Sequence, residues 1–312
     1  MNGRRVLGIV LIAIALVAPW FAYPVFLMTA LCFALFACAF NLLIGYVGLL
    51  SFGHAMFFGT AAYVCGHTVK EWGWAPELGV LAGALAAGAL GTVTGALAIR
   101  RQGIYFAMIT LAFSQMIFFF CVQAPFTHGE DGLQGIPRKA LLGGLLPIAD
   151  DRVLYYVVLA VFLFGFAAIY RIIHSPFGQV LKAIRENEPR AVSLGYNADR
   201  YKLLAFILSA TLAGLAGATK AIVLQFATLS DVTSAMSGEV VLMALVGGIG
   251  TIFGPVLGAF TIITMQNYLA QVGEWVLVIQ GVIFVVIVMA FRKGIVGEIA
   301  ERWRLWRQPK AV

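Results

Sequence analysis

Long runs of apolar residues alternate with short polar stretches along most of the chain. Within each run the apolar residues are continuous, whereas the strands of a membrane β-barrel alternate between apolar and polar positions. Because hydrocarbon offers no partner to a free backbone N–H or C=O group, each run is expected to be a helix. Ten segments fit this description: 6–22, 25–44, 47–69, 78–99, 103–123, 153–173, 203–223, 238–250, 252–270 and 275–291. We therefore predict an all-α polytopic membrane protein with about ten transmembrane helices, including short segments broken by glycine.

Two longer polar stretches separate these segments. Residues 124–152 are rich in glycine and proline, which predicts an irregular loop. Residues 174–202 contain good helix formers after Pro176, and proline is favourable in the first turn of a helix. We expect Pro189 to interrupt this helix and Gly195 to end the region with a turn. This second stretch predicts a short helical element that lies along one face of the membrane.

The composition supports a bilayer environment. The 312 residues are 62% hydrophobic and 11% charged, whereas soluble domains carry about 25% charged residues. We treat residues 1–312 as a single membrane domain and expect segment 6–22 to be an uncleaved span. The cysteines lie inside apolar runs without a CxxC pair, so they are expected to pack as small apolar residues. They are Cys32, Cys38, Cys65 and Cys121.

The charged residues predict an orientation. If the N-terminus is cytoplasmic and all ten segments cross, 16 of the 21 basic residues face the cytoplasm, with five of the 14 acidic residues. The resulting charges, +11 inside and −4 outside, follow the positive-inside rule. Both termini and segment 174–202 are then cytoplasmic, and loop 124–152 is periplasmic. The net charge of +7 reflects this topology, so we expect no nucleic-acid partner.

Segment 238–250 is short for a transmembrane helix. Fusing it with 252–270 would move the basic C-terminus to the outside, against the positive-inside rule. Parity therefore favours either two crossings or none in this part of the chain.

The apolar segments carry almost no ionisable side chains. Ion and proton relays in membranes depend on such groups, so we do not expect coupling to a proton or sodium gradient. Lys220 is the exception, and we expect its long side chain to snorkel to the outer boundary. His54 is interpreted as a polar group that hydrogen-bonds to a neighbouring helix. The chain has no Gly-Lys-Ser/Thr motif for nucleotide phosphates, so any ATP that drives it would bind to another chain.

Small residues also recur at helical spacing. They are Gly79, Gly83, Ala87, Gly91 and Gly95, with a similar series at Gly250, Gly254 and Gly258. Small residues four positions apart allow two helices to approach closely in lipid. This pattern predicts helix packing.

Two glycine-rich segments, GYVGLLSFG (45–53) and GGIGTIFGP (247–255), lie in opposite halves of the chain. In repeat-built transporters, such paired interruptions point to a pathway near the membrane midplane. We hypothesise that these bends line the translocation pathway, with plain helix packing as the alternative. The candidate pathway residues are Asn41, Gly45, Gly48, Ser51, His54, Gly248, Gly250, Thr251 and Gly254.

Four stretches carry a family resemblance. They are NLLIGYVGLLSFGHAMFFGTAAY (41–63), GIYFAMITLAFSQ (103–115), SPFGQVLKAIRENEPRAVSLGYN (175–197) and LVGGIGTIFGPVLGAF (245–260). In sequence, order and spacing they resemble the permease family of branched-chain amino-acid ABC importers, in its LivM-like branch. THGEDGL (127–133) also resembles the family's outer Gly-Asp-Gly-Leu loop, and the similarity covers most of the chain.

The resemblance implies a permease subunit of an ATP-driven importer in the bacterial inner membrane. It implies as partners a second related permease, two cytoplasmic ATPases that bind ATP and Mg²⁺, and a periplasmic substrate-binding protein. This chain itself is expected to hold no cofactor and no metal.

Segment 175–197 is similar to the element that ABC importers dock into a groove of the ATPase. Glu188, Ala191 and Gly195 match the Glu-x-x-Ala-x-x-x-Gly part of its pattern, whereas Pro189 departs from the usual Glu-Ala-Ala sequence. The docking geometry is therefore left open. The candidate coupling residues are Ala183, Arg185, Glu186, Glu188, Ala191 and Gly195.

Three alternatives remain. The same machine could carry urea, short amides or aromatic acids, because selection lies largely in the binding protein. An ion-coupled secondary transporter would need intramembrane carboxylates. An enzyme or structural subunit would need a clustered metal or nucleophile set, whereas the four histidines are scattered. We do not expect an enzyme.

Overall fold

The computed structural model describes residues 15–141, 148, 150–269, 276–290 and 294–298. Almost all of this part of the chain is helical, as the apolar pattern predicted. Its helices are α2 (Pro24–Asn41), α3 (His54–Lys70), α4 (Pro76–Ala98), α5 (Ile104–Gln123), α6 (Asp151–His174), α7 (Pro176–Glu186), α8 (Glu188–Ser193), α9 (Ala198–Leu224), α10 (Ser234–Gly247), α11 (Gly254–Leu269) and α12 (Val276–Ala290). A π-helical segment, Leu42–Val47, continues α2.

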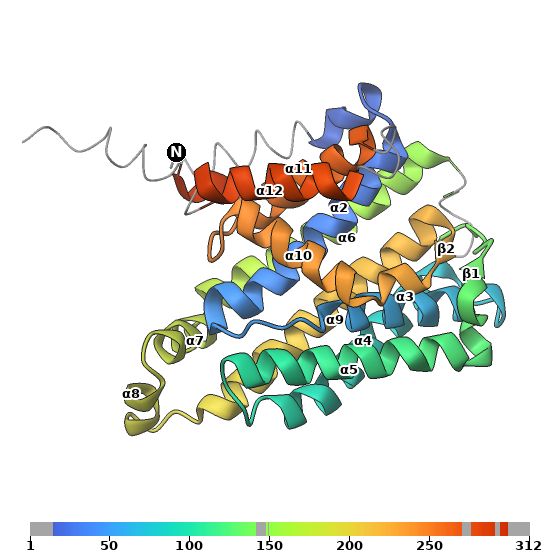
Figure 1. Ribbon diagram of the computed structural model, residues 1–312. Helices are drawn as coiled ribbons and strands as arrows, with labels where there is room; N and C mark the ends of the chain where they lie inside the picture. Colours follow the sequence, from blue (N-terminus) through green and yellow to red (C-terminus); the bar gives the residue numbers. More distant parts are fainter. Residues whose placement is uncertain (1–14, 142–147, 149, 270–275, 291–293, 299–312) are drawn as a thin grey trace, which may run out of the picture.

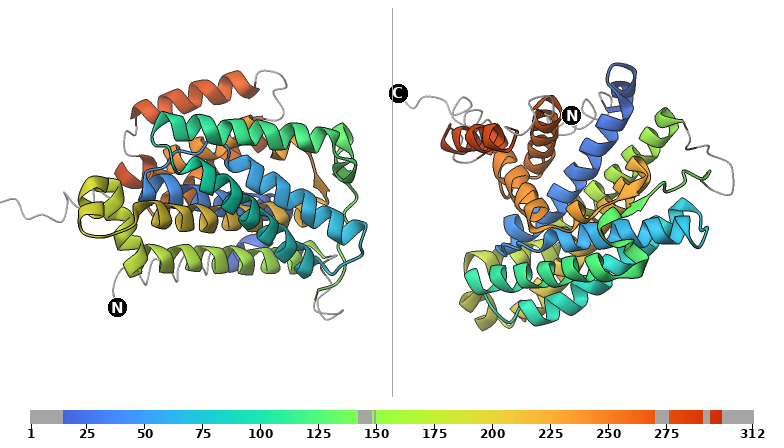
Figure 2. Two further views of the ribbon diagram at one scale, coloured as in Figure 1. Left: turned by 90° about the horizontal axis from the view of Figure 1, so that it is seen from below. Right: turned by 45° about the vertical axis from the view of Figure 1, so that its right-hand side comes forward.

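The helices form a bundle with two distinct ends (Figures 1 and 2). α9 lies at the centre and packs against α2, α3 and α4. The α7–α8 pair lies at one end, which we call the coupling end, and the short strands β1 (Leu133–Gln134) and β2 (Phe226–Ala227) pair at the opposite end, which we call the loop end (Figure 1). The α10 and α11 helices pack against each other and against α2.

Five helices in the described part of the chain are long and apolar enough to span a membrane. They are Pro24–Val47, Pro76–Ala98, Ile104–Gln123, Asp151–His174 and Ala198–Leu224. The other predicted segments correspond to the shorter helices α3, α10, α11 and α12, apart from segment 6–22, most of which lies outside the described residues. The fold is therefore an all-α membrane bundle in which full-length and short helices are mixed.

The helix predicted over 47–69 is shorter than its apolar run, because the glycine-rich bend expected at 45–53 interrupts it. The π-helical segment ends at Gly48, whose φ of 83° lies in the left-handed region that favours glycine. The chain is then non-helical until α3 begins at His54. As a result, α3 has 17 residues and begins inside the bundle rather than at one of its ends.

Helices α10 and α11 form a tight antiparallel hairpin. A Cβ atom on Gly247 would collide with the carbonyl of Gly254, and one on Gly258 with that of Met243. With 14 residues, α10 is about 21 Å long, shorter than the roughly 30 Å of a hydrocarbon core. Because a hairpin returns the chain to its starting side, it satisfies the parity that the charge distribution requires.

The small residues on α4 form a packing face, as predicted. A Cβ atom on Gly83 would lie 2.6 Å from the carbonyl oxygen of Ala61 in α3, and one on Gly91 would lie 2.6 Å from the Cβ of Ala210 in α9. Gly95 meets Phe206 of α9 in the same way. These glycines therefore allow α4 to lie against α3 and α9 at close range.

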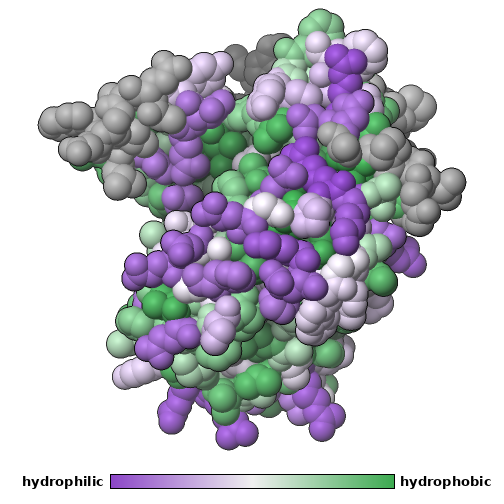
Figure 3. Space-filling model, turned by 90° about the vertical axis from the view of Figure 1, so that its right-hand side faces the viewer, coloured by the Kyte–Doolittle hydropathy of each residue, from purple (hydrophilic) through white to green (hydrophobic). Residues whose placement is uncertain are grey.

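The opposite faces of the peripheral helices expose large apolar side chains. On α4 these include Leu81, Leu85 and Val93, and on α5 they include Met108 and Phe119. Hydrophilic residues instead gather across the loop end (Figure 3). This distribution is that of a bundle surrounded by hydrocarbon or by other apolar helices, with a polar end in water.

The polar stretch 124–152 is irregular in its described part, as predicted. It contains single turns of 3-10 helix at Pro125–Thr127 and Gly129–Asp131, followed by β1. Arg138 ties this loop to the rest of the bundle, because it donates hydrogen bonds to the carbonyl oxygen of Val223 at 2.6 Å and to Asp151 at 2.6 Å. The loop is thus fastened to the last turn of α9 and the first turn of α6.

The snorkelling predicted for Lys220 is wrong. Its side chain is 4% exposed, and its Nζ atom donates to the two carboxylate oxygens of Asp231 at 2.8 and 2.7 Å. Asp231 is 2% exposed and belongs to a turn after β2 that packs against α3, α5 and α10. The charge partner lies eleven residues further along the chain, beyond the end of α9, so no pattern within the helix predicts the pair.

Candidate functional site

A contact between α7 and the π-helical segment links the coupling end to the interior. The guanidinium group of Arg185 turns inward and donates a hydrogen bond to the main-chain carbonyl oxygen of Gly45. A Cβ atom on Gly48 would lie 3.1 Å from Cγ of the same arginine. Lys182, one turn earlier, places its ammonium group 5.6 Å from the ring centre of Tyr46. Two cations of α7 therefore hold the last turn of the segment 42–47.

The side chain of Asn41 connects this segment to the α10–α11 hairpin. Its Nδ2 donates to the carbonyl oxygen of Thr251 and its Oδ1 accepts from the amide of Gly250, both at 2.9 Å. Asn41 is 3% exposed, so both bonds are shielded from water. Because a buried amide must satisfy its donor and its acceptor, this residue fixes α2 to the turn of the hairpin.

The two glycine-rich segments meet at this point. A Cβ atom on Gly45 would lie 2.8 Å from the amide nitrogen of Gly250. The hydroxyl of Thr251 donates to the carbonyl oxygen of Gly248 at 2.7 Å and accepts from the amide of Gly254 at 3.1 Å. Glycine is required here because two main chains approach without room for side chains.

Seven candidate pathway residues therefore form one cluster, which lies toward the coupling end. They are Asn41, Gly45, Gly48, Gly248, Gly250, Thr251 and Gly254. We call them the glycine junction. This arrangement could not be predicted from the sequence, because Asn41 and Gly250 are 209 residues apart.

The other two candidate pathway residues, Ser51 and His54, lie deeper in the bundle, and both are fully buried. The Nε2 atom of His54 lies 2.8 Å from the hydroxyl of Ser209 in α9, and aromatic rings of Phe40 and Phe57 surround the imidazole. This confirms that His54 hydrogen-bonds to a neighbouring helix. Both residues are packed inside the chain and line none of the cavities described here.

The non-helical segment 48–53 connects the glycine junction to the start of α3, which lies deeper in the bundle. The amide of Phe52 donates to the hydroxyl of Thr110 in α5 at 3.2 Å, and the amide of Ala55 donates to the hydroxyl of Ser237 in α10 at 3.0 Å. Side chains of neighbouring helices thus replace the partners that a helix would have provided. An apolar groove of about 430 Å³ lies between this segment and the start of α5.

The predicted surface helix consists of two parts. Pro176 is in the first turn of α7, and the hydroxyl of Ser175 caps it by accepting from the amide of Gly178 at 3.3 Å. The helix ends at Glu186, and Asn187 caps α8 by accepting from the amide of Arg190 at 3.1 Å. The interruption expected at Pro189 is therefore present, two residues earlier, because a proline has no amide hydrogen to continue α7 and is well tolerated in the first turn of α8.

Two of the six candidate coupling residues are held by contacts within this chain. Glu188 accepts from Lys202 of α9 at 2.6 Å and from Gln102, after α4, at 2.9 Å. Ala191 is 2% exposed and packs with Ile184 and Ala198. These residues therefore position α8 on the bundle: Ala191 is buried there, and Glu188, which stays partly exposed, pairs with α9.

The other candidates differ in their surroundings. Ala183 and Glu186 lie on the exposed face of α7, and Arg185 is turned into the glycine junction. Gly195 has a φ of 90°, and a Cβ atom on it would meet nothing within 4 Å. Gly195 is thus required for the turn that follows α8 rather than for close packing.

The described residues contain no group of three or more histidine, cysteine, aspartate or glutamate side chains that could hold a metal ion. All four cysteines are buried and free, which agrees with their predicted packing role. The site therefore consists of main-chain contacts, amide hydrogen bonds and cations.

The family of this chain follows from comparison with known proteins. The model of the family described as "Branched-chain amino acid transport system / permease component" matches residues 24–288. The chain belongs to this family. The match includes the glycine junction, α7 and α8.

Several individual proteins are similar to this chain, each at a low sequence identity. The LivM permease proteins of the high-affinity branched-chain amino acid transport systems of Escherichia coli K12 and Salmonella typhimurium LT2 are each 27% identical over 82% of this chain. The chain spans 65% of the length of these two relatives. The xylose transport system permease XylH of Escherichia coli K12 is 24% identical over 54% of this chain and 44% of its own length. No solved structure matches.

In this permease, sequence reasoning missed an apolar surface beside the coupling residues. Val192, Leu194 and Tyr196 are 53%, 71% and 41% exposed, although they lie in the most polar part of the chain. Val192 and Tyr196 line a surface hollow of about 620 Å³, together with the charged residues Arg100, Glu188 and Asp199. Exposed apolar residues with a charged rim are typical of protein interfaces. In the sequence these apolar residues stand within a polar segment. That position was the signal that their side chains lie on the surface.

Proposed function

We propose that this chain is one of two permease subunits in an ABC importer that carries branched-chain or related small amino acids across the bacterial inner membrane. Separate ATPase subunits, with their ATP and Mg²⁺, would supply the energy, and a periplasmic binding protein would deliver the substrate. The observation that carries the proposal is the bond from Arg185 of the surface helix to Gly45 inside the bundle. An importer without its own nucleotide site needs such a mechanical link.

In this proposal α7 and α8 dock on the ATPase. Ala183 and Glu186 on α7, together with the exposed side chains of Val192, Leu194 and Tyr196, offer a surface of mixed apolar and charged character. Closure of the ATPases on ATP would push this surface toward the membrane. Glu188 and its partner Lys202 would keep α8 attached to α9 during the movement.

The displacement would then pass through the glycine junction. Arg185 and Lys182 would carry it to the π-helical segment, and Asn41 from there to the α10–α11 hairpin. π-helical turns are rare and frequently lie at functional sites, so this segment is where we expect the winding of the helix to change. ATP would stabilise one of the two arrangements over the other, as any ligand that shifts a conformational equilibrium must.

The orientation in the membrane belongs to the same proposal. The coupling end would face the cytoplasm with both termini, and the loop end would face the periplasm. Ten segments would enter or cross the membrane, with α10 and α11 as a hairpin that reverses inside it. The polar residues that gather over the loop end support this placement (Figure 3).

The proposal is tested by reconstituting the chain with its partner permease, the ATPases and the binding protein in proteoliposomes. Uptake of leucine should require ATP inside the vesicles and binding protein on the other side. Uptake of urea or benzoate instead of leucine would still support an ATP-driven importer but would contradict the proposed substrate. Uptake that needs only a sodium or proton gradient would overturn the proposal.

A further inference from the structure

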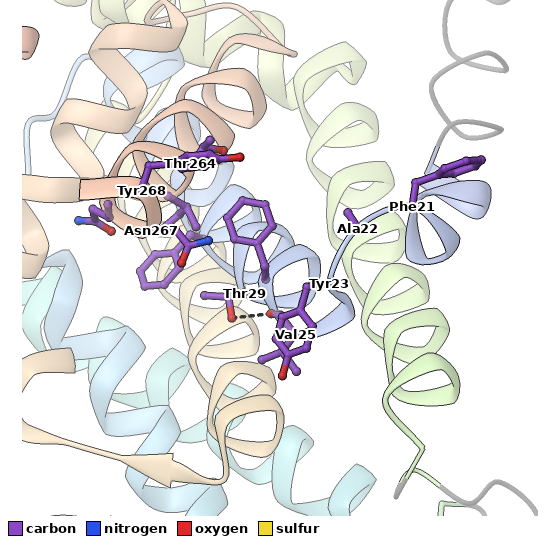
Figure 4. Close-up of a pocket in the computed structure, with 12 residues that line it drawn as sticks. Phe21, Ala22, Tyr23, Val25, Thr29, Thr264, Asn267 and Tyr268 are labelled. Atoms are coloured by element: carbon purple, nitrogen blue, oxygen red, sulfur yellow. Dashed lines mark hydrogen bonds between the residues drawn. The ribbon is translucent and has the colours of Figure 1, made fainter. Parts of the chain in front are cut away.

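A large cavity opens between α2 and α11, away from the glycine junction. It has a volume of about 740 Å³ and lies between the first turns of α2 and the last turns of α11 (Figure 4). The α7–α8 pair lies at the other end of α2 (Figure 1). In the proposed orientation the cavity therefore faces the periplasmic side.

One wall of the cavity is polar, although it belongs to an apolar helix. Thr264, Gln266 and Asn267 of α11 line it, and Thr29 of α2 faces them from the opposing wall (Figure 4). The hydroxyl of Thr29 donates to the carbonyl oxygen of Val25 at 2.8 Å, which leaves its oxygen able to accept a further bond. In a membrane such polar groups are costly unless they serve a pathway or a partner.

Gln266 also forms a side-chain hydrogen bond with Glu239 of α10, which does not itself line the cavity. The rest of the lining is apolar and includes Phe26, Phe33 and Ile263. The cavity thus combines hydrogen-bonding amide and hydroxyl groups with an apolar surface.

We infer that this cavity is the vestibule that receives the substrate, and that it binds a small apolar amino acid as a zwitterion. The ammonium group is held by the Gln266 amide oxygen, the carboxylate accepts from the Asn267 amide, and the aliphatic side chain lies against Phe33 and Ile263. A pocket of this kind, apolar with a few placed polar groups, is typical of small-molecule sites. The inference rests on the proposed function, because only a transport pathway brings amino acids to this place.

Cysteine labelling tests occupancy directly. All four native cysteines are buried, so an Asn267→Cys variant offers the reactive thiol in the assembled complex. A membrane-impermeant maleimide added from the binding-protein side should label it, and millimolar leucine should slow labelling several-fold, whereas sucrose at the same concentration should not. Equal labelling rates in leucine and sucrose would overturn the inference. Labelling of the isolated chain but not of the complex would also overturn it, since the partner permease would then fill the cavity.

Transport measurements test the named residues. Gln266→Leu and Asn267→Leu should each lower the maximal rate of leucine uptake about tenfold, as expected for the loss of one or two hydrogen bonds, while the complex still assembles. Thr261→Val is the matched control, because its hydroxyl is on the same helix and donates to Leu257 at 2.8 Å without lining the cavity. Unchanged rates in both leucine variants would contradict the assignment. A wild-type complex that takes up no leucine would instead refute the proposed cargo, whatever the labelling shows.

Discussion

Arg185 of the surface helix α7 donates a hydrogen bond to the main-chain oxygen of Gly45 in the π-helical segment. This bond joins two residues that are 140 positions apart and belong to separate predicted features, the coupling element and a glycine-rich bend. Because the acceptor is a backbone carbonyl, the proposed movement of α7 would act on the main chain of the bundle. The contact between Arg185 and Gly45 is therefore the first one to test by mutation.

Removing the cation of Arg185 should uncouple the importer. Arg185→Ala loses the bond to Gly45 and the contact beside Gly48, and a hydrogen bond from a charged donor contributes about 1.5–3 kcal/mol. We expect leucine uptake to fall roughly tenfold or more while ATP hydrolysis by the complex continues. Arg185→Lys should retain part of the function, since a lysine keeps the charge but not the planar guanidinium.

The control for this variant is Arg190→Ala, which removes an exposed arginine of α8 from the same segment. Uptake and ATP hydrolysis are both measured in proteoliposomes. If Arg185→Ala and Arg190→Ala transport equally well, the contact with Gly45 carries no coupling.

Loss of the Asn41 side chain should destabilise the junction. Asn41→Leu removes two buried hydrogen bonds and leaves the amide of Gly250 and the carbonyl of Thr251 unpaired. Each unsatisfied buried group costs about 1–3 kcal/mol, so the thermal unfolding temperature of the purified chain in detergent should fall. Thr261→Val, whose hydroxyl bonds only within its own helix, should leave that temperature nearly unchanged, and an equal shift in both variants would argue against a special role for Asn41.

Side chains at the left-handed glycines should block transport. Gly48 and Gly250 have φ values of 83° and 77°, which cost a residue with a Cβ atom about 1–2 kcal/mol, and the leucine side chain would also meet Arg185. We predict that Gly48→Leu and Gly250→Leu each abolish uptake while the complex still assembles. Gly238→Ala is the control, because a Cβ atom there meets nothing within 4 Å, and normal uptake in both leucine variants would refute the pathway role of the junction.

The buried pair Lys220–Asp231 should behave as a unit. Removing one partner leaves an isolated charge in the interior, which typically costs about 3–5 kcal/mol, whereas replacing both partners by neutral groups of similar size is often close to neutral. Lys220→Met and Asp231→Asn should therefore each lower the thermal unfolding temperature in detergent, and the double variant should recover most of the loss. Strictly additive losses would show that the two charges do not stabilise each other.

Much of the secondary structure was predictable because the bilayer leaves the chain few choices. Continuous apolar runs predicted helices in nine segments that the structure describes, and small residues at a spacing of four predicted the packing face of α4. The two polar stretches were also recognised as an irregular loop and a surface helix. Each of these inferences rests on a local property of the sequence, either hydrophobicity over a window or the spacing of small residues.

What the sequence could not determine is which distant residues meet. The left-handed Gly48 ends a helix that hydropathy alone continues, the partner of Lys220 is an aspartate in a turn, and Glu188 pairs with Lys202 of α9. The sequence by itself determined the membrane environment, the helices and the family resemblance, because these follow from composition and local pattern. Only the tertiary structure decided that Arg185, Gly45, Asn41 and Gly250 form one junction, because hydrogen bonds between main chain and side chain leave no periodic trace in the sequence.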